Sequence, residues 1–395
     1  MKFSTLFVSM LLVSMNAFAG AVEEEKAEQQ QQLILEDIIC VGNKKTKCSL
    51  IRKEIRLKPN KAVKQDELKN AKIRLNLLGL FDSVDMSLEK GSAKGRVDLK
   101  IEVKEASSYY TVTGLQFGKY EKEWTAGSAQ FTLGNRNLFG KGKRLALTYT
   151  TDINELDGYD GSATYNRARI NYTDPNLFGS KRFFGSIDLS HGKNNGRYGA
   201  SNYTTGSLEL GYRIRKFSYL TLGYGKLGIN YEDDNDKAFD GNYKQNDFIL
   251  GYGFNTQDDA YFPTRGSRFD LKIALGSSGV SMPGFYSGGT FSDFDWRTTW
   301  GIGNKYYLTG FMEKRSYDDS EEFLNSGLGL EMAKQVRKNR KDKDISDARF
   351  YIAPSINGYS GFNGTAYGVA AGVKLRSKKY GLARIELFYR GDSDD

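Results

Sequence analysis

The chain has 395 residues and a formal net charge of +9, with 44 glycines, 25 tyrosines, 24 phenylalanines and only 5 prolines. Because the basic residues are scattered among alternating segments and do not form one block, the charge argues against a nucleic-acid-binding surface. The single histidine, His191, falls in a predicted surface loop, and no Gly-x-Ser-x-Gly motif occurs. We therefore expect no catalytic residues, no metal site and no other cofactor. This composition instead favours long paired strands with tight turns and aromatic girdles.

Residues 1–19 have the features of a cleaved secretory signal peptide. Lys2 gives a positive start, residues 3–15 are almost all apolar, and Ala17-Phe18-Ala19 supplies small residues at the cleavage spacing. The alternative, a membrane anchor, needs about 20 apolar residues, which is more than this run provides. The chain is therefore expected to be exported. Residues 20–32 are rich in Glu and Gln without periodicity and are expected to form a disordered leader.

Residues 33–105 predict a small α+β domain. A first strand over 33–39 is followed by a turn at Gly42-Asn43. Apolar residues at helical spacing then predict helices over 49–56 and 66–78. Two alternating strands follow, near 84–88 and 97–103. The predicted order is β-α-α-β-β.

Two cysteines, Cys40 and Cys48, lie near the start of this domain. An exported protein meets an oxidising compartment, where a disulfide between them is permitted. The sequence alone does not establish that the geometry suits a disulfide, so a pair of buried free thiols is the alternative.

From residue 106 to 395 the chain consists of repeated alternating segments. Leu208, Leu210 and Tyr212, for example, alternate with Glu209 and Gly211. A soluble sandwich has the same period, but charged residues in mid-strand and strand lengths of about 9 to 11 residues favour a transmembrane β-barrel. One face of each strand would meet lipid and the other would line the lumen.

We predict about 12–14 antiparallel strands, and 14 by our own count. The predicted strands lie near residues 107–118, 124–134, 143–153, 160–172, 182–191, 203–214, 218–231, 244–256, 267–276, 288–300, 305–315, 346–356, 364–375 and 380–390. An even number would keep both ends of the barrel chain on the periplasmic side. Residues 316–345 form the longest segment that we predict to be irregular, and this segment contains a basic run from Lys334 to Lys343.

Three turns in this region share glycines and an aromatic residue: residues 134–142, 174–179 and 261–267. Their motif residues are Gly134, Asn137, Phe139, Gly140, Gly142, Asp174, Pro175, Phe178, Gly179, Phe262, Pro263 and Gly266. The glycines permit a tight backbone where a strand reverses, and Phe139 and Phe178 could anchor at the membrane interface. The alternative is that these are ordinary turns without a role in recognition.

These three turns in order, behind one β-α-α-β-β unit, resemble the BamA/TamA outer-membrane assembly family, also called the bacterial surface antigen family. Gly42-Asn43 and Leu78-Gly79-Leu80-Phe81 sit where recurrent residues of its polypeptide-transport-associated (POTRA) domain lie. The chain departs from the family in having one POTRA-like domain and fewer strands than the usual 16. It also lacks an Arg-Gly-Phe/Tyr motif in residues 316–345, which leaves insertase activity open.

The resemblance implies help with inserting or moving proteins or lipids at the outer membrane. A lateral seam between the first and last strands could open, and its free edges could pair with a client strand. The candidate seam residues are Tyr109, Thr111, Phe117, Ile385, Leu387 and Tyr389. The strand from Val97 to Val103 could be the POTRA edge that accepts an extended peptide.

The implied partners are outer-membrane lipids including lipopolysaccharide, unfolded outer-membrane clients and periplasmic chaperones, without nucleic acid. The basic run at 334–343 could bind lipopolysaccharide phosphates if it faces outside, although a solvated loop is the simpler interpretation. The alternative function is a passive channel or a lipid-organising structural barrel. Lumen cations would then tune permeation, and the candidates are Arg213, Arg268, Lys272 and Lys374.

Overall fold

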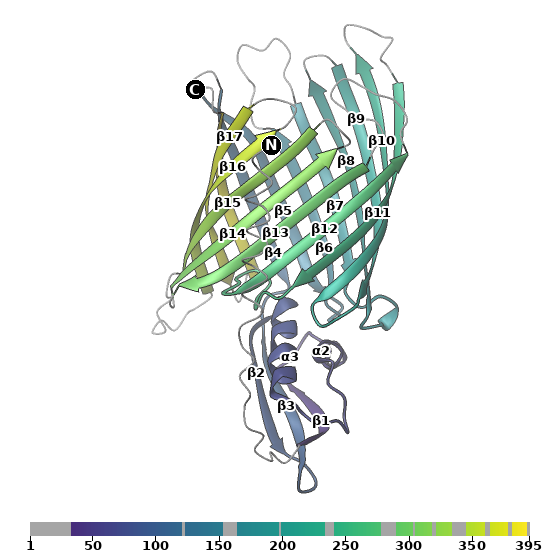
Figure 1. The fold of residues 1–395 in the computed structure, drawn as a ribbon, viewed down its shortest axis with the longest axis vertical. Coiled ribbons are helices and arrows are strands. Elements are labelled where there is room, and N and C mark those ends of the chain that lie inside the picture. The colour runs from purple at the N-terminus through teal and green to yellow at the C-terminus, as the bar shows by residue number, and fades with distance from the viewer. Residues whose placement is uncertain are drawn as a thin grey trace, which may run out of the picture.

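The structure, a computed structural model, places a small N-terminal domain at one end of a closed β-barrel (Figure 1). It describes residues 33–120, 123–152, 164–196, 199–233, 241–277, 290–302, 305–317, 321–333, 345–359, 364–377 and 381–392. The predicted signal peptide and leader lie outside the described residues. No helix in the described ranges is long and apolar enough to cross a membrane.

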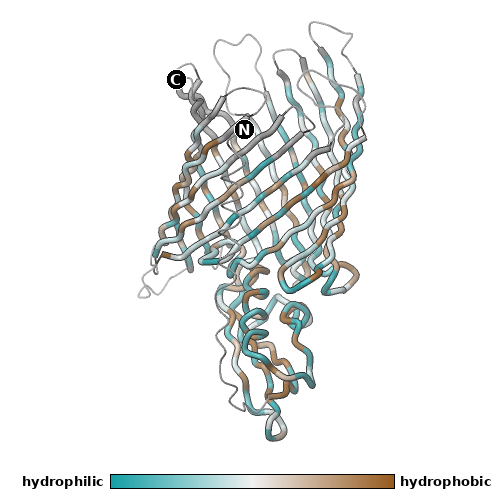
Figure 2. Tube along the Cα trace, in the orientation of Figure 1, coloured by the Kyte–Doolittle hydropathy of each residue, from teal (hydrophilic) through white to brown (hydrophobic). Residues whose placement is uncertain are grey.

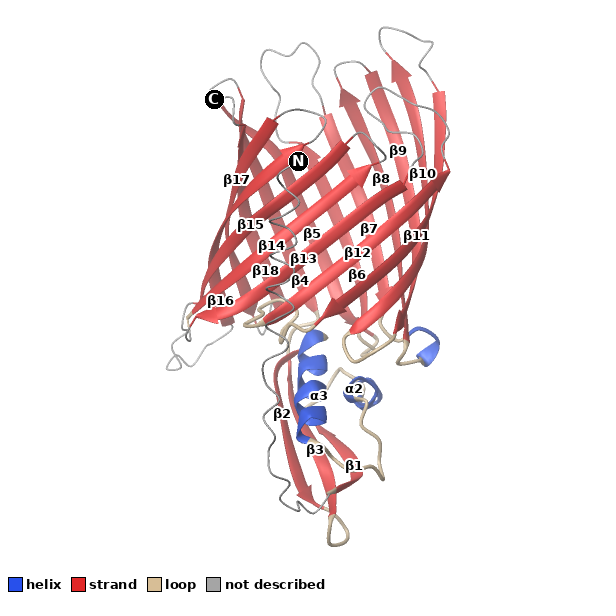
Figure 3. Ribbon diagram, in the orientation of Figure 1, coloured by secondary structure: helices blue, strands red, loops and turns tan. Residues whose placement is uncertain are grey.

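The N-terminal domain has the predicted β-α-α-β-β order (Figure 3). Its elements are β1 (Ile34–Val41), α2 (Cys48–Ile55), α3 (Gln65–Leu77), β2 (Phe81–Lys90) and β3 (Arg96–Glu105). The sheet order is β1-β3-β2, with β1 parallel and β2 antiparallel to β3. The expectation that 97–103 forms a sheet edge is therefore wrong. Its four alternating apolar residues suit a central strand, since Leu99 and Ile101 are fully buried.

A buried arginine joins the two helices of this domain. Arg74 of α3 donates from Nε to the Glu54 carbonyl oxygen at 2.8 Å and from its terminal nitrogen to the Ile55 carbonyl oxygen at 2.5 Å. Burial lowers the pKa of Arg74 to about 10. The contact satisfies two carbonyls at the C-terminal end of α2, which would otherwise lack helical partners. It thereby fixes α2 against α3 above the apolar core.

The barrel contains 15 strands that close on themselves. In chain order they are β4 (Tyr109–Tyr120), β5 (Glu123–Leu138), β6 (Lys143–Asp152), β7 (Thr164–Asp174), β8 (Phe183–Gly196), β9 (Gly199–Arg213), β10 (Ser218–Asp233), β11 (Gly241–Asn255), β12 (Gly266–Ser277), β13 (Thr290–Ile302), β14 (Tyr306–Tyr317), β15 (Glu321–Ala333), β16 (Ile345–Tyr359), β17 (Gly364–Ser377) and β18 (Gly381–Asp392). The predicted fold class, an all-β barrel behind one small α+β domain, is confirmed. His191 lies in β8 and not in a loop, with its Nδ1 atom 3.0 Å from the Thr204 hydroxyl.

The predicted count of 14 strands is wrong by one, because β15 lies inside the segment that we expected to be irregular. Among its described side chains, the exposed apolar ones are Leu328, Leu330 and Met332. The strand pairs with β14 from Tyr317↔Glu321 to Tyr306↔Met332. This pairing with a neighbour establishes β15 as a strand, although we did not predict one from the local sequence pattern. With an odd number of strands, β4 and β18 both run away from the N-terminal domain. The expectation that both barrel ends lie on the same side is therefore also wrong.

Hydrophobic and hydrophilic positions alternate along the barrel strands (Figure 2). The outward face carries half-exposed apolar residues, whereas the lumen face carries ion pairs. On β9, for example, Leu208 and Leu210 are 48% and 42% exposed, and Glu209 between them pairs with Lys272 inside the lumen. An apolar band of this extent is stable only when lipid covers it.

Aromatic rings packed on glycines account for part of the high content of glycine, tyrosine and phenylalanine. On the lumen face, five aromatic residues lie directly opposite a glycine of the next strand. These pairs are Tyr110–Gly134, Phe184–Gly211, Tyr219–Gly253, Phe311–Gly327 and Tyr351–Gly372. A Cβ atom on any of these glycines would lie 2.0 to 2.7 Å from the nearest atom of the aromatic side chain. The ring occupies the space that a side chain would fill, which fixes the register of each pair.

The substitution Gly211→Ala is expected to destabilise the barrel by about 1–3 kcal/mol, because the new methyl group would overlap the Phe184 ring. Urea unfolding in detergent micelles would measure the change. The control is Gly228→Ala in β10, where a Cβ atom would meet nothing within 4 Å. Equal stability losses in the two variants would contradict the ring-on-glycine interpretation.

Candidate functional site

The residues selected from the sequence gather at two places. One is the joint between the first and last barrel strands, and the other is the barrel end that faces the N-terminal domain. All six candidate seam residues lie on β4 or β18. The turn-motif residues lie at or beside the connections β5–β6, β7–β8 and β11–β12, all at the domain-facing end.

The joint between β4 and β18, called the seam here, pairs residues from Tyr110↔Leu382 to Gly118↔Arg390. Its two strands run parallel, whereas every other neighbouring pair of described barrel strands is antiparallel. Parallel ladders are slightly less stable per residue than antiparallel ones. The seam is therefore the one joint among the described barrel strands that has this less favourable pairing geometry.

The outward face of the seam combines apolar residues on β18 with Thr111, Thr113 and Leu115 on β4. Ile385 and Leu387 are 54% and 48% exposed. The register sets Ile385 beside Thr113 and continues to Thr111. Threonine hydroxyls gain little from contact with lipid, so the part of β4 at Thr111 and Thr113 presents a less apolar face than β18 does. Tyr109 is exposed at the start of β4, Tyr389 is half-buried, and the side chain of Phe117 lies outside the described residues.

On the lumen side, contacts tie each seam strand to the wall behind it. Arg384 and Glu386 of β18 form an ion pair, and the Tyr351 hydroxyl of β16 donates to the Glu386 carboxylate. Arg384 also donates from Nε to the Tyr351 hydroxyl at 3.0 Å. β18 is thus linked to β16 across β17, just as β4 is linked to β5 by Tyr110 on Gly134.

The first turn docks on the N-terminal domain through residues 42–47, called the docking loop here. The Lys47 amide donates to the Gly140 carbonyl oxygen at 2.9 Å, and the Asn137 side-chain amide donates to the Thr46 hydroxyl at 3.0 Å. Gly140 has a φ of +68°, and a Cβ atom there would lie 2.1 Å from the Lys45 carbonyl oxygen. Glycine at 140 therefore serves the close approach of two domains as well as the turn.

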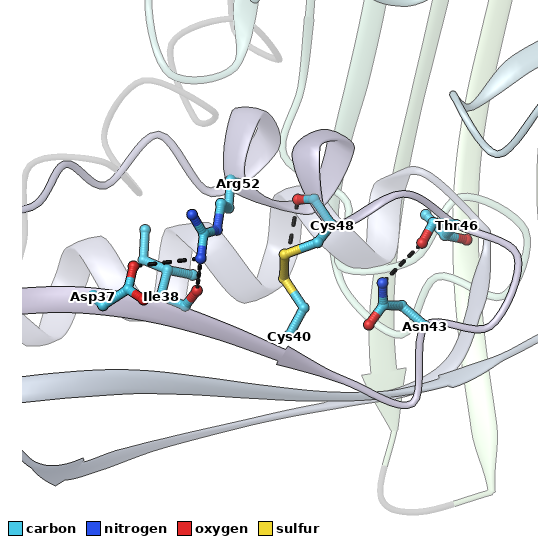
Figure 4. Close-up of a disulfide and its surroundings, with 7 residues drawn as sticks. All are labelled: Asp37, Ile38, Cys40, Asn43, Thr46, Cys48 and Arg52. Carbon is cyan, nitrogen blue, oxygen red and sulfur yellow. Dashed lines mark hydrogen bonds and ion pairs between the residues drawn. A yellow bond between two sulfur atoms is a disulfide. The ribbon is translucent and has the colours of Figure 1, made fainter.

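The two cysteines brace this docking loop. Cys40 at the end of β1 and Cys48 at the start of α2 form a disulfide on either side of it (Figure 4). Within the loop, the Asn43 side-chain amide donates to the Thr46 carbonyl oxygen at 3.0 Å. The Glu105 carboxylate accepts the Lys45 and Thr46 amides, at 2.9 and 2.5 Å for the shorter contact of each. The disulfide and these bonds hold the loop in the shape that meets Gly140.

The second turn is built around Asp174, Pro175 and a short 3-10 helix over Leu177–Gly179. Asp174 pairs with Lys143 at 3.0 Å, and the Pro175 carbonyl oxygen accepts from Arg213 at 2.9 Å. Phe178 is 86% exposed, and Phe139 of the first turn is 78% exposed. Exposed aromatic residues at one end of the barrel suit the lipid–water interface.

The third connection, residues 256–265 between β11 and β12, is called the plug turn here because strands from around the barrel hold it. Arg349 of β16 donates to the carbonyl oxygens of Phe262 and Pro263, both at 2.8 Å. Arg376 of β17 contacts both carboxylate oxygens of Asp259, at 2.9 and 3.0 Å. Neither β16 nor β17 is a neighbour of β11 or β12, so the turn reaches across the opening.

Phe262 lies at the centre of the plug turn and is only 3% exposed. The guanidinium carbons of Arg349 and Arg376 lie 5.1 and 4.7 Å from its ring centroid, within the range of cation–π attraction. Arg349 also lies 4.2 Å from the Tyr307 ring centroid and pairs with Glu331 at 3.4 Å. Pro263 contributes its carbonyl, and Gly266 opens β12 with a φ of +103°.

The plug turn also contacts the N-terminal domain. A Cβ atom on Gly79, which follows α3, would lie 2.4 Å from the Tyr261 ring. The Arg136 guanidinium of β5 lies 5.3 Å from the centroid of that ring. A cavity of about 690 Å³ lies between α3 and the plug turn, with Lys69 and Phe262 among its lining residues. The plug turn therefore lies between the domain and the lumen.

Sequence reasoning found the plug turn but missed the arginines that hold it. These residues are Arg136, which lies over the Tyr261 ring, and Arg349 and Arg376, which bond to the turn. In the sequence, each of them is an arginine on the lumen-facing side of a strand, near the strand end that faces the N-terminal domain. The pattern along one strand does not reveal which turn such a cation meets across the barrel.

Family models match two parts of the chain. The POTRA model, described as a surface antigen variable number repeat, matches residues 34–106, and the Omp85 superfamily domain matches residues 137–321. The outer membrane protein assembly factor BamA of Neisseria meningitidis serogroup B is 24% identical over 277 residues, which are 64% of this chain and 33% of that protein. BamA of Nitratidesulfovibrio vulgaris is 28% identical over 119 residues, 30% of this chain and 14% of that protein. The matched part is thus a third or less of these relatives.

Solved structures show the same fold. CdiB from Escherichia coli aligns with a TM-score of 0.59 at 11% identity, covering 88% of this chain and 70% of that chain. CdiB from Acinetobacter baumannii aligns with a TM-score of 0.54 at 11% identity, covering 88% and 68%. At this level of identity the likeness concerns the fold alone.

Proposed function

We propose that this chain, which belongs to the BamA/TamA family of POTRA-bearing outer-membrane barrels, assists the insertion or translocation of polypeptides at the outer membrane. In this proposal the POTRA domain lies in the periplasm. The observation that carries the proposal is the parallel seam between β4 and β18. Opening the seam would expose two rows of backbone donors and acceptors to which an extended client strand can pair. The activity requires backbone pairing and no catalytic side chain or cofactor.

The POTRA domain would deliver clients to the seam. Because β3 is central, its sheet offers β2 (Phe81–Lys90) and β1 as edges. An extended segment of a client or of a periplasmic chaperone could add to such an edge by strand addition. The docking loop and the plug turn hold this domain directly beneath the barrel, which shortens the path between the two strand edges.

The direct test is the folding of an unfolded outer-membrane client into proteoliposomes that contain the full chain. We expect faster folding than with an inert barrel of similar size. A disulfide across the seam, made by Thr113→Cys with Ile385→Cys, should abolish the acceleration, because these residues are register partners. The wild-type protein under the same oxidising and reducing conditions controls for the native disulfide.

The matched control joins β9 to β10 by Leu210→Cys with Leu222→Cys, which are also register partners on the outward face. This disulfide stiffens the wall but leaves the seam free, and acceleration should survive. Unchanged acceleration in the oxidised seam variant would contradict the proposal. Loss of acceleration in both variants would assign the effect to wall stiffness and not to the seam.

The passive-channel alternative assigned the tuning of permeation to four lumen cations, and three of these cations are paired with carboxylates. Lys272 pairs with Glu209 at 2.5 Å, Arg268 pairs with Asp270 at 2.7 Å, and Lys374 pairs with Glu331. Arg213 donates to the carbonyl oxygens of Pro175 and Lys181. Cations paired with carboxylates give little net attraction for anions, so the pairing of Lys272, Arg268 and Lys374 weakens the channel alternative, whereas the carbonyl contacts of Arg213 leave its charge in place.

The lipopolysaccharide hypothesis rested on the basic run at 334–343, which lies outside the described residues. The flanking strands β15 and β16 end and begin, respectively, at the POTRA-facing end.

A further inference from the structure

Basic side chains of the POTRA domain and of the barrel meet at the second turn, away from the seam. They are called the basic corner here, and they are Lys53, Arg56, Lys58, Lys181 and Arg182. The first three lie in α2 or just after it, and the last two lie just before β8. The Lys53 Nζ atom lies 3.8 Å from the position that a Cβ atom on Gly179 would take. The Arg56 guanidinium donates to the Arg215 carbonyl oxygen at 3.3 Å, so the two domains touch at this corner.

The charges of the basic corner act on one another. Burial lowers the pKa of Lys181, and three neighbouring cations lower it further. These neighbours are Lys58, Arg56 and Arg182. Within the described part of the chain, none of the five cations forms an ion pair. Like charges at close range repel each other, so a bound anion would stabilise this junction of the two domains.

The nearby carboxylates are engaged elsewhere. Glu54, next to Lys53 in α2, is 6% exposed, and its charge acts on the buried arginines Arg74 and Arg213. Asp174 of the second turn pairs with Lys143 at 3.0 Å. The basic corner therefore keeps a positive charge that the carboxylates beside it do not balance.

The second turn lies against the outer surface of the barrel wall. A Cβ atom on Gly185 of β8 would lie 3.2 Å from the Leu177 side chain and 3.5 Å from that of Leu210. Leu210 is on the outward face of β9, so Leu177 packs on the lipid-facing side. Figure 3 shows the short helix of this turn beside the barrel end. The side chain of Phe178 is 86% exposed there.

An arginine and aromatic rings meet on the same outward face. Arg182 donates from its terminal nitrogen to the Tyr212 hydroxyl at 2.9 Å. The Tyr212 ring lies 5.2 Å from the ring of Phe183, which is 44% exposed. Aromatic residues of this kind mark the level of the lipid headgroups, where the phosphates lie. The position of Arg182 therefore puts a guanidinium at the level of the phosphates.

We infer that the basic corner binds the phosphate of an anionic phospholipid, in the leaflet on the POTRA side, and that this lipid links the POTRA domain to the barrel. Guanidinium and ammonium groups bind phosphate through charge-assisted hydrogen bonds, and clustered basic residues at a membrane surface bind anionic headgroups. The acyl chains would lie along the outward face, beside Phe178 and Leu210. This lipid site is independent of client insertion, because it is built from the second turn and α2.

The test measures lipid binding to the full chain in detergent micelles by native mass spectrometry. The probes are phosphatidylglycerol, which is anionic, and phosphatidylethanolamine with the same acyl chains, which is zwitterionic. We expect the wild type to bind phosphatidylglycerol more tightly. Lys53→Gln with Arg182→Gln should weaken this binding by at least about tenfold, because each cation near an anionic lipid contributes to the attraction.

The matched control is Lys141→Gln with Lys305→Gln. Both lysines are exposed, and they lie in the connections β5–β6 and β13–β14 at the same end of the barrel. This pair removes the same charge outside the basic corner and should leave the affinity within about twofold of the wild type. Lys53→Arg with Arg182→Lys keeps both charges and should retain binding. Gel migration of unheated samples checks that each barrel is folded.

The single substitutions Lys53→Gln and Arg182→Gln test whether the two domains share the lipid, and each should weaken binding. A loss confined to Arg182→Gln would overturn the shared site. Equal losses in the corner variant and the control pair would assign the effect to net charge and overturn the inference. Displacement of the lipid by an equal concentration of glycerol phosphate would assign the corner to free phosphate. Displacement by a glutamate-rich soluble peptide would assign it to an acidic polypeptide, and either result would overturn the lipid site.

Discussion

Replacing Arg349 by alanine is expected to destabilise the barrel by about 3–5 kcal/mol, the cost of breaking a buried ion pair by removing one partner. The Arg349 side chain is 3% exposed and bonds two plug-turn carbonyls as well as Glu331. Lys374 still contacts Glu331 in the variant, so the Glu331 carboxylate keeps one cationic partner. We therefore expect a loss of stability near the lower end of this range. Urea unfolding in detergent micelles measures the free energy.

The same substitution should also increase ion conductance in planar bilayers, because the plug turn loses the bonds that hold it to β16. The control is Arg297→Ala, whose side chain is 44% exposed in the lumen where it pairs with Asp295 and Glu313. An exposed pair contributes about 0–1 kcal/mol, so this variant should unfold nearly as the wild type does. Similar losses in both variants, or unchanged conductance with Arg349→Ala, would contradict the assigned role of the plug turn.

Replacing Gly140 by alanine is expected to loosen the POTRA domain from the barrel. The new Cβ atom would lie 2.1 Å from the Lys45 carbonyl oxygen, and a φ of +68° adds strain of about 1–3 kcal/mol. The bond from the Lys47 amide to the Gly140 carbonyl oxygen should then open more often. Hydrogen exchange of the Lys47 amide measures this directly, and we expect exchange at least about tenfold faster, equivalent to about 1.4 kcal/mol.

Gly95 provides the matched control for this experiment. It has a φ of +83° in the turn between β2 and β3, but a Cβ atom there would meet nothing within 4 Å. Gly95→Ala introduces the same kind of backbone strain without a clash between the domains. Exchange at Lys47 should remain as in the wild type. If both variants accelerate this exchange equally, the effect comes from domain stability and the docking role of Gly140 is wrong.

Local patterns in the sequence are enough to predict the fold class and the order of the parts. Alternation such as Leu208-Glu209-Leu210 sets one residue to the lipid and the next to the lumen whatever the neighbouring strands are. The helices of the POTRA domain follow from equally local spacing. The turn motifs could be found in the same way, because glycines such as Gly140 mark positions where the backbone must reverse or approach closely.

The tertiary structure alone decided how many strands close the barrel and what each lumen cation contacts. β15 becomes a strand through pairing with β14, in a segment that we predicted to be irregular. That added strand changes the parity of the barrel and makes the seam parallel. Arg349 and Arg376 meet Phe262 across the opening, more than 80 residues away in sequence. Local alternation carries no information about such distances, because it fixes which face a residue occupies and not which strand lies opposite.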